Sequence, residues 1–210
     1  MANEVQLSKR LSWLLRHGAV QEGIPICSDG FVPVNSIIEN PKYACDYDLR
    51  TLQEIVRKDK KQRYTLRQNM HGLWEIRANQ GHSMVNVLAS HCLQRIYSSE
   101  EVNIAVHGTY YRHWERILLE GLRTMGRTHV HFAMYDDNRI FNQKNNAISG
   151  FRSDCELLIY LDVRKAMELG EMEIYRSTNN VILCAGINGC ISKDYFKLVV
   201  DRRTMKALSF

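Results

Sequence analysis

The stretch RYTLRQNMHGLWEIR, residues 63–77, decides the fold of the first half of this 210-residue chain. Residues 63–67 and 73–77 alternate polar and apolar side chains, and the polar turn between them contains His71 and Gly72. Two alternating segments on either side of such a turn predict a β-hairpin. A hairpin that follows short helices is the element order of a winged-helix module.

The residues before the hairpin show the helical spacing that this order requires. Four leucines at i, i+4, i+7 and i+8 predict an amphipathic helix over residues 5–16. Gly18 follows it, where a helix C-cap is expected. A turn then leads into a short strand over residues 31–34, and a second helix is expected over residues 48–58.

After about residue 95 the sequence becomes richer in strand signals. Strands are expected at residues 103–106, 129–133, 157–162, 181–185 and 195–200, and helices at 112–120 and 163–169. A polar, Asn-rich stretch at residues 136–146 is expected to form a mobile loop. These patterns predict an α+β chain of two lobes, residues 1–95 and residues 96–210.

Composition narrows the class of protein. Twenty-eight Lys and Arg against 23 Asp and Glu give a net charge of +5, which suits a nucleic-acid partner without demonstrating one. No apolar run is long enough for a membrane span, and the initial MANEVQLSKR lacks the apolar stretch of a secretory signal. Six scattered cysteines without a CxxC pair argue against a zinc ribbon or a disulfide framework. An intracellular protein, cytoplasmic or nuclear, is therefore expected.

Basic residues cluster at two places in the first lobe. Arg16 and His17 fall in the last turn of the first predicted helix, where cations also interact favourably with the helix dipole. Capping therefore explains these two residues as well as a functional role does. The basic run over residues 58–63 is either a solvated face or a surface that contacts RNA phosphates. Arg63 stands apart because it opens a predicted strand, which would fix its orientation.

Two short patterns in the second lobe could hold a ligand. His107, Gly108 and Thr109 end a predicted strand, and a glycine between hydrogen-bonding side chains lets a ligand approach the backbone closely. Residues 149–153 could hold a phosphate or a ribose. Each pattern is explained equally well as an ordinary turn at the end of a strand.

A third pattern contains two histidines. Strand alternation would place Arg127, His129 and His131 on one face. A zinc site needs three or four ligands, and no carboxylate or cysteine stands nearby at ligand spacing. The interpretation favoured is a cationic strip that faces a phosphate-bearing ligand, and no metal ion is expected.

Taken in order, these strings resemble the NAD-dependent RNA 2′-phosphotransferases, the family known for the last step of tRNA splicing. The matching strings cover residues 7–17, 29–33, 61–64, 78–83, 107–109, 126–131, 148–153, 176–177 and 181–183. Each string is short, but their joint order is specific and spans residue 5 to about residue 200. Two departures, the longer Asn-rich loop and Phe151 where Met is usual, concern contacts with NAD and not the reaction class.

The resemblance implies the architecture and the site residues. It implies a winged-helix RNA-binding lobe over residues 1–95 and an NAD-binding lobe of ADP-ribosyltransferase type over residues 96–210. The catalytic tetrad of the family falls on Arg16, His17, Arg63 and Arg127. The implied NAD-binding residues are His107, Gly108, Thr109, His131, Gly150 and Arg152, and the RNA-binding residues are Lys9 and Lys61.

The resemblance also implies a reaction in which an internal 2′-phosphate of RNA, in particular of spliced tRNA, is transferred to NAD. The phosphate first displaces nicotinamide, which gives an ADP-ribosylated RNA phosphate. The ribose 2″-hydroxyl then attacks phosphorus and releases 2′-hydroxyl RNA and ADP-ribose 1″,2″-cyclic phosphate. Such chemistry needs positioning and charge compensation, which arginine forks supply. NAD as co-substrate, an RNA partner, no metal, no membrane contact and a monomeric chain are expected.

Two other functions stay open at this point. The chain could be an ADP-ribosyltransferase that modifies terminal phosphates of RNA or DNA and stops after the first step. It could also be a winged-helix RNA-binding protein without catalysis, whose second lobe is degenerate.

Overall fold

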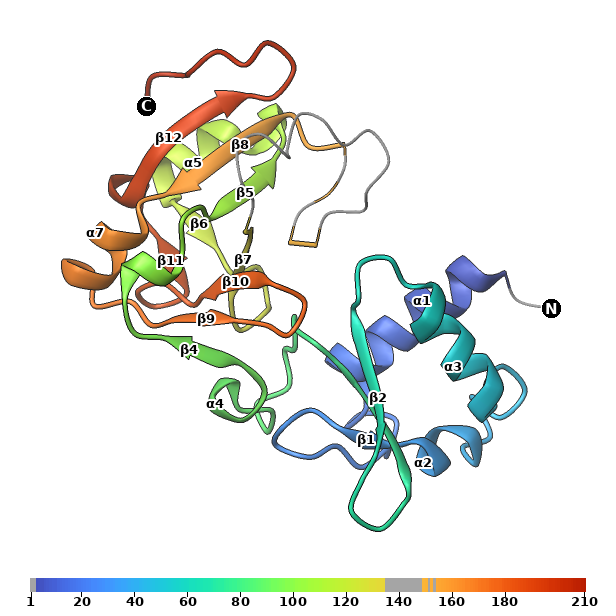
Figure 1. The fold of residues 1–210 in the computed structure, drawn as a ribbon. Coiled ribbons are helices and arrows are strands. Elements are labelled where there is room, and N and C mark those ends of the chain that lie inside the picture. Colours follow the sequence, from blue (N-terminus) through green and yellow to red (C-terminus); the bar gives the residue numbers. More distant parts are fainter. Residues whose placement is uncertain (1–2, 135–148, 151, 153) are drawn as a thin grey trace. The chain divides into compact units, whose positions relative to one another are not determined.

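The computed structural model describes residues 3–134, 149, 150, 152 and 154–210 (Figure 1). The Asn-rich stretch at residues 136–146 and Phe151 lie outside the described residues. The chain divides into two compact units, Met1–Leu93 and Gln94–Phe210. Helices and antiparallel strand pairs occur in both units, so the α+β class predicted from the sequence is confirmed.

The first unit is built around the predicted hairpin. Its elements are α1 (Glu4–Trp13), the π-helix η1 (Leu14–Gly18), β1 (Val32–Pro33), α2 (Val34–Ile38), α3 (Leu49–Lys58), β2 (Tyr64–Gln68), β3 (Trp74–Ala78) and α4 (Ala89–Cys92). β2 and β3 pair antiparallel as expected, and β1 pairs with the other side of β3. The second predicted helix is confirmed as α3, whose N-cap Asp48 accepts a 2.6 Å hydrogen bond from the backbone N–H of Thr51.

The core of this unit forms where the apolar faces of these elements meet. Leu11 of α1 and Leu14 of η1 are fully buried, and so are Leu52 of α3 and Ile76 of β3. Full burial of each such side chain stabilises the fold by about 1.5–3 kcal/mol. Because α1, η1, α3 and the hairpin share this core, the segments between them are held against a rigid base.

The end of the first helix differs from the prediction. α1 stops at Trp13 and the chain continues through one π turn, in which the N–H of Ala19 donates to the carbonyl of Leu14 at 2.9 Å. Gly18 is therefore not a left-handed C-cap but part of the π turn. A Cβ atom at Gly18 would lie 2.3 Å from the Trp13 ring, so glycine is needed there for close packing.

A second difference concerns the strand expected over residues 31–34. Only Val32 and Pro33 pair with the hairpin, as β1, and Val34 begins the short helix α2. A two-residue strand contains too few side chains to show alternation, so the sequence did not separate the strand from the helix that follows.

The second unit is a twisted antiparallel sheet with short helices (Figure 1). Its elements are β4 (Gln94–Ile96), η2 (Ser99–Glu101), β5 (Val106–Thr109), η3 (Tyr111–His113), α5 (Trp114–Glu120), β6 (Leu122–Arg123), β7 (Val130–Ala133), β8 (Leu157–Leu161), α7 (Val163–Glu168), β9 (Ile174–Arg176), β10 (Val181–Cys184), β11 (Cys190–Ile191), η4 (Lys193–Tyr195) and β12 (Phe196–Asp201). Within the described residues, seven strands follow the order β12-β8-β5-β7-β10-β9-β4. β5 and β7 therefore lie side by side in the middle of the sheet, which brings residues 106–109 next to residues 130–133.

Of the five strands predicted in this unit, four form within one residue of the predicted ends, whereas β4, β6, β9 and β11 were not predicted. The exception is β5, which forms at Val106–Thr109 instead of residues 103–106. The shift has a consequence for the site, because the ligand pattern around Gly108 lies inside a paired strand and not in a turn. Over the part of the chain that the structure describes, no helix is both long and apolar enough to span a bilayer.

Candidate active site

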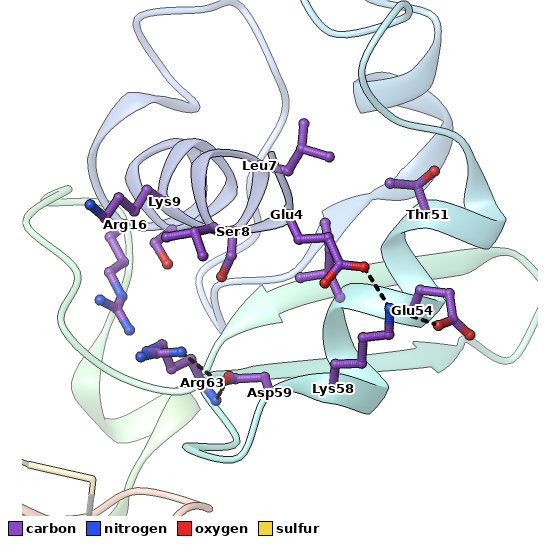
Figure 2. A pocket seen from close by; sticks show the side chains of 13 residues that line it. Glu4, Leu7, Ser8, Lys9, Arg16, Thr51, Glu54, Lys58, Asp59 and Arg63 are labelled. Carbon is purple, nitrogen blue, oxygen red and sulfur yellow. Dashed lines mark hydrogen bonds and ion pairs between the residues drawn. The ribbon is translucent and has the colours of Figure 1, made fainter. Parts of the chain in front are cut away.

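A surface cavity of about 530 Å³ in the first unit is lined by α1, η1, α3 and the turn that follows α3. Figure 2 shows Arg16 and Arg63 at one end of this cavity, with Lys9 on the same side. At the other end, Lys58 is paired with Glu4 at 2.5 Å, so its charge is compensated. The first end carries Arg16, Arg63 and Lys9 against the one carboxylate of Asp59, so it keeps a net positive charge, which suits a phosphate group.

Arg63 is held in place by Asp59, whose carboxylate is almost completely buried. This carboxylate accepts the backbone N–H of Arg63 at 2.5 Å and pairs with its Nη1 atom. It also accepts the backbone N–H of Lys61 at 3.2 Å, as an Asx turn does. Asp59 therefore occupies one side of the guanidinium and fixes its direction. Asp59 is not among the residues predicted from the sequence, although an acidic residue four positions before Arg63 is a signal for this turn.

Asn79 holds the same turn from the hairpin side. Its Nδ2 atom donates to the carbonyl of Gln62 at 2.7 Å, and its backbone N–H donates to the carbonyl of Arg63 at 2.7 Å. Gln62 adopts a positive φ of 48°, a conformation that is costly for a residue with a side chain. The two hydrogen bonds offset that cost, and they place Arg63 at the start of β2 with little freedom.

Arg16 and His17 both lie in the π turn, but their surroundings differ. Arg16 lines the cavity, whereas His17 is absent from the described residues that line it. The Nδ1 atom of His17 is 2.8 Å from the Oγ atom of Ser83, and the Ser83 N–H donates to the carbonyl of Arg16 at 2.9 Å. The carbonyl of Arg16 is thus satisfied by the N–H of Ser83.

The two predicted RNA-binding lysines are placed differently as well. Lys9 is exposed on α1 and lines the cavity. Lys61 is half-buried in the turn that Asp59 stabilises, and it is absent from the described residues that line the cavity. Of these two lysines, only Lys9 lines the cavity with Arg16 and Arg63, whereas Lys61 shares the carboxylate of Asp59 with Arg63.

Substitution Gly18→Ala is expected to destabilise the protein by about 1–3 kcal/mol, because the new methyl group would overlap the Trp13 ring. Urea unfolding of the full chain measures this loss. The double variant Trp13→Ala/Gly18→Ala removes the ring that the methyl group meets, so Gly18→Ala should cost much less in that background. Equal costs in the two backgrounds would show that the contact between Trp13 and Gly18 does not hold the π turn.

In the second unit, His107 of β5 has its Nδ1 atom 2.9 Å from the carbonyl of His131 on β7. A carbonyl only accepts, so Nδ1 carries the proton, and Nε2 of the neutral ring is left as an acceptor. Burial lowers the pKa of His107, although the hydrogen bond to His131 opposes this effect. His107 is therefore neutral at neutral pH. Thr109 and His131 are buried, so these two residues of β5 and β7 pack within the unit.

Two arginines of the second unit lie close enough to affect one another. Burial and the charge of Arg152 lower the pKa of Arg127, but an arginine remains protonated at neutral pH. A hydrogen bond with Tyr110 raises the pKa of Arg152. Two guanidinium groups that repel each other would both be stabilised by an anion, and a diphosphate is such an anion.

Gly150 lies close to β7. Its φ is +104°, and a Cβ atom there would be 2.8 Å from the backbone of Ala133. Glycine is therefore required by both the conformation and the space at this position.

The prediction that strand alternation places Arg127, His129 and His131 on one face is wrong. Only His131 lies in β7, because Arg127 and His129 precede the first paired residue, Val130. His129 is buried with its ring 5.7 Å from that of Tyr175, so it has a packing role. Strand alternation does not apply outside the strand. In the described part of the chain, no group of three or more His, Cys, Asp or Glu side chains is arranged to hold a metal ion.

Comparison with known proteins supports the family resemblance seen in the sequence. The model of the RNA 2′-phosphotransferase, Tpt1 / KptA family matches residues 2–186. The chain belongs to this family. Among RNA 2′-phosphotransferase relatives, the tRNA 2′-phosphotransferase 1 of Homo sapiens is 39% identical over 98% of this chain, and the tRNA 2′-phosphotransferase of Saccharomyces cerevisiae is 31% identical over 88%.

The chain spans different shares of its RNA 2′-phosphotransferase relatives. It covers 79% of the human protein and 80% of the Saccharomyces cerevisiae protein. A Schizosaccharomyces pombe relative is 40% identical over 93% of this chain, which spans about half, 51%, of that protein. Family membership makes the cationic end of the cavity, with Arg16 and Arg63, the candidate site for a phosphate of RNA.

Proposed function

We propose that this chain transfers the internal 2′-phosphate of RNA, in particular of spliced tRNA, to NAD. The products are RNA with a 2′-hydroxyl, ADP-ribose 1″,2″-cyclic phosphate and nicotinamide, and the intermediate is an ADP-ribosylated RNA phosphate. The observation that carries this proposal is the cationic end of the cavity. Arg16 and Arg63 line it together, and Asp59 orients Arg63. The chain that contains this cavity belongs to the RNA 2′-phosphotransferase family.

In the first unit, Arg16 and Arg63 bind the oxygens of the 2′-phosphate, and His17 donates a proton to the departing 2′-oxygen. Lys9 and Lys61 contact the RNA backbone. The phosphate is already anionic, so it needs no general base. The helices α1, α2 and α3, together with the hairpin β2–β3 to which β1 adds a third strand, support a winged-helix interpretation of this unit.

In the second unit, NAD supplies the electrophilic ribose carbon and the hydroxyl that accept the phosphate. The donor chemistry fits, because Arg127 and Arg152 supply two guanidinium groups to this unit and Nε2 of His107 can accept a hydrogen bond from a ribose hydroxyl. Gly108 lies in β5 between His107 and Thr109, and Gly150 packs closely against the backbone of Ala133. Arg127 also holds the charge of the phosphoryl oxygens. The strand-rich unit supports an ADP-ribosyltransferase interpretation.

NAD binding is expected to weaken at acidic pH. Burial lowers the pKa of His107 below the ordinary histidine pKa of about 6.5. Its Nε2 atom therefore remains an acceptor at pH 6.5, and it becomes protonated only under more acidic conditions. Calorimetric titration with NAD should give a constant Kd from about pH 8 to about pH 6.5 and a rising Kd below that range. His107→Asn should bind weakly throughout and show a flatter pH dependence. An unchanged slope in His107→Asn would assign the titration to another group.

One assay separates the proposed function from its alternatives. An oligonucleotide with an internal 2′-phosphate is incubated with the chain, with and without NAD, beside an oligonucleotide with a 5′-terminal phosphate. NAD-dependent loss of the 2′-phosphate together with a cyclic-phosphate product supports the proposal. Stable ADP-ribosylation of the terminal phosphate alone would identify a terminal-phosphate ADP-ribosyltransferase. RNA binding without any turnover would identify a binding protein.

A further inference from the structure

Ser83 makes two hydrogen bonds to adjacent residues of the π turn. Its backbone N–H donates to the carbonyl of Arg16 at 2.9 Å, and its Oγ atom lies 2.8 Å from Nδ1 of His17. Ser83 is half-buried and follows the hairpin by a short segment, so the contact joins two parts of the first unit that are 66 residues apart. Only the side-chain contact depends on the residue being serine.

A hydroxyl is a special partner for an imidazole nitrogen because it can donate or accept. When His17 is protonated, both ring nitrogens carry protons, and Nδ1–H can donate to the Oγ atom while the Nε2 proton is the one that can be transferred. After Nε2 has given up its proton, the neutral ring still carries the Nδ1 proton and keeps the same hydrogen bond. The hydrogen bond at Nδ1 therefore survives the release of the Nε2 proton.

We infer that Ser83 is a positioning residue, whose hydroxyl accepts a hydrogen bond from Nδ1–H of His17 and holds the imidazole while Nε2–H gives its proton to the departing 2′-oxygen. This inference rests on the proposed function, in which His17 serves the 2′-phosphate. Ser83 does not touch the reacting atoms. It fixes the ring orientation of the residue that does, and the hydrogen bond at Nδ1 is kept while His17 releases and regains the Nε2 proton.

A purely structural role for Ser83 is the alternative. The N–H of Ser83 already joins the segment to the carbonyl of Arg16, and alanine keeps that hydrogen bond. Substitution Ser83→Ala therefore removes only the contact with His17. The chain also offers a matched control, because Ser28 Oγ lies 2.9 Å from Nδ1 of His91 in an exposed pair of the same unit, and neither residue lines the cavity.

The test compares Ser83→Ala, Ser83→Thr and Ser28→Ala in the full chain. We expect Ser83→Ala to lower kcat about tenfold, the rate equivalent of one hydrogen bond, with KM for 2′-phosphorylated RNA nearly unchanged and with an altered pH profile of kcat. Ser83→Thr keeps the hydroxyl and should restore most of the rate. Ser28→Ala should match wild type. A kcat and pH profile that Ser83→Ala leaves unchanged would overturn the inference, and so would a threonine variant as slow as alanine.

A second measurement needs no turnover. Nitrogen-15 chemical shifts of the His17 ring in the wild-type chain, assigned with a His17→Gln variant, should show Nδ1–H as the neutral tautomer, and Ser83→Ala should mix the two tautomers. If Nε2–H is the neutral tautomer of the wild-type chain, or if Ser83→Ala leaves the tautomer unchanged, the inference is wrong. If the shifts follow the expectation but RNA is not turned over, the proposed function fails while the positioning contact stands.

Discussion

Arg63→Ala is expected to lower the rate of 2′-phosphate transfer about 10²–10³-fold, because an oriented donor to a transition-state oxyanion contributes about 3–4 kcal/mol. Arg63 is the cation of the cavity whose direction is best determined. Asp59 binds its backbone N–H and its Nη1 atom, and Asn79 binds its carbonyl. A side chain held in this way loses little entropy when it binds a phosphate, so its removal costs nearly the full interaction. Single-turnover rates with NAD and 2′-phosphorylated RNA measure the effect.

Arg57→Ala is the matched control for Arg63→Ala. Arg57 is exposed on α3, is paired with Glu54 at 2.8 Å and is absent from the described residues that line the cavity. The two variants lose the same formal charge, so a general loss of attraction to RNA would slow both equally. Arg63→Lys should stay well below the wild-type rate, since an ammonium group cannot replace the two-pronged donor. Turnover by Arg63→Ala within threefold of wild type would contradict the role proposed for it.

Arg127→Ala is expected to slow the second step about 10²-fold or more and to let ADP-ribosylated RNA accumulate. The first step starts from an anionic phosphate and releases neutral nicotinamide, so it depends less on one guanidinium. The second step develops charge on the phosphoryl oxygens, which is the charge that Arg127 is proposed to hold. RNA labelled at its 2′-phosphate, followed over time, shows the intermediate directly.

The control for Arg127→Ala is Arg123→Ala. Arg123 is exposed on β6 in the same unit and is paired with Glu120 at 3.0 Å. It should clear the labelled intermediate at the wild-type rate. If Arg127→Ala also clears the intermediate at that rate, Arg127 has no special part in the second step. If instead neither step proceeds in Arg127→Ala while its thermal unfolding is unchanged, the residue is needed for binding before either step.

The sequence by itself predicted the elements whose signal is local. The hairpin at residues 63–77 and the helix α3 follow from alternation and helical spacing within about ten residues, and the structure confirms both. Family membership was also predictable, because it depends on the order of short strings along the chain. The same strings selected Arg16 and Arg63, which the structure places around one cavity.

Only the tertiary structure decided how those side chains are held. The π turn at residues 14–18 depends on the fit between Trp13 and Gly18, and nothing in helical periodicity predicts it. The residues that hold Arg63 and His17 lie at different distances from them along the chain. Asp59 is four residues from Arg63, but Ser83 is 66 residues from His17. Periodicity describes neighbours within one element, whereas a hydrogen bond across 66 residues exists only after α1 and the hairpin pack on a common core. The sequence therefore determined which cations the chain carries, and packing determined in which direction they point.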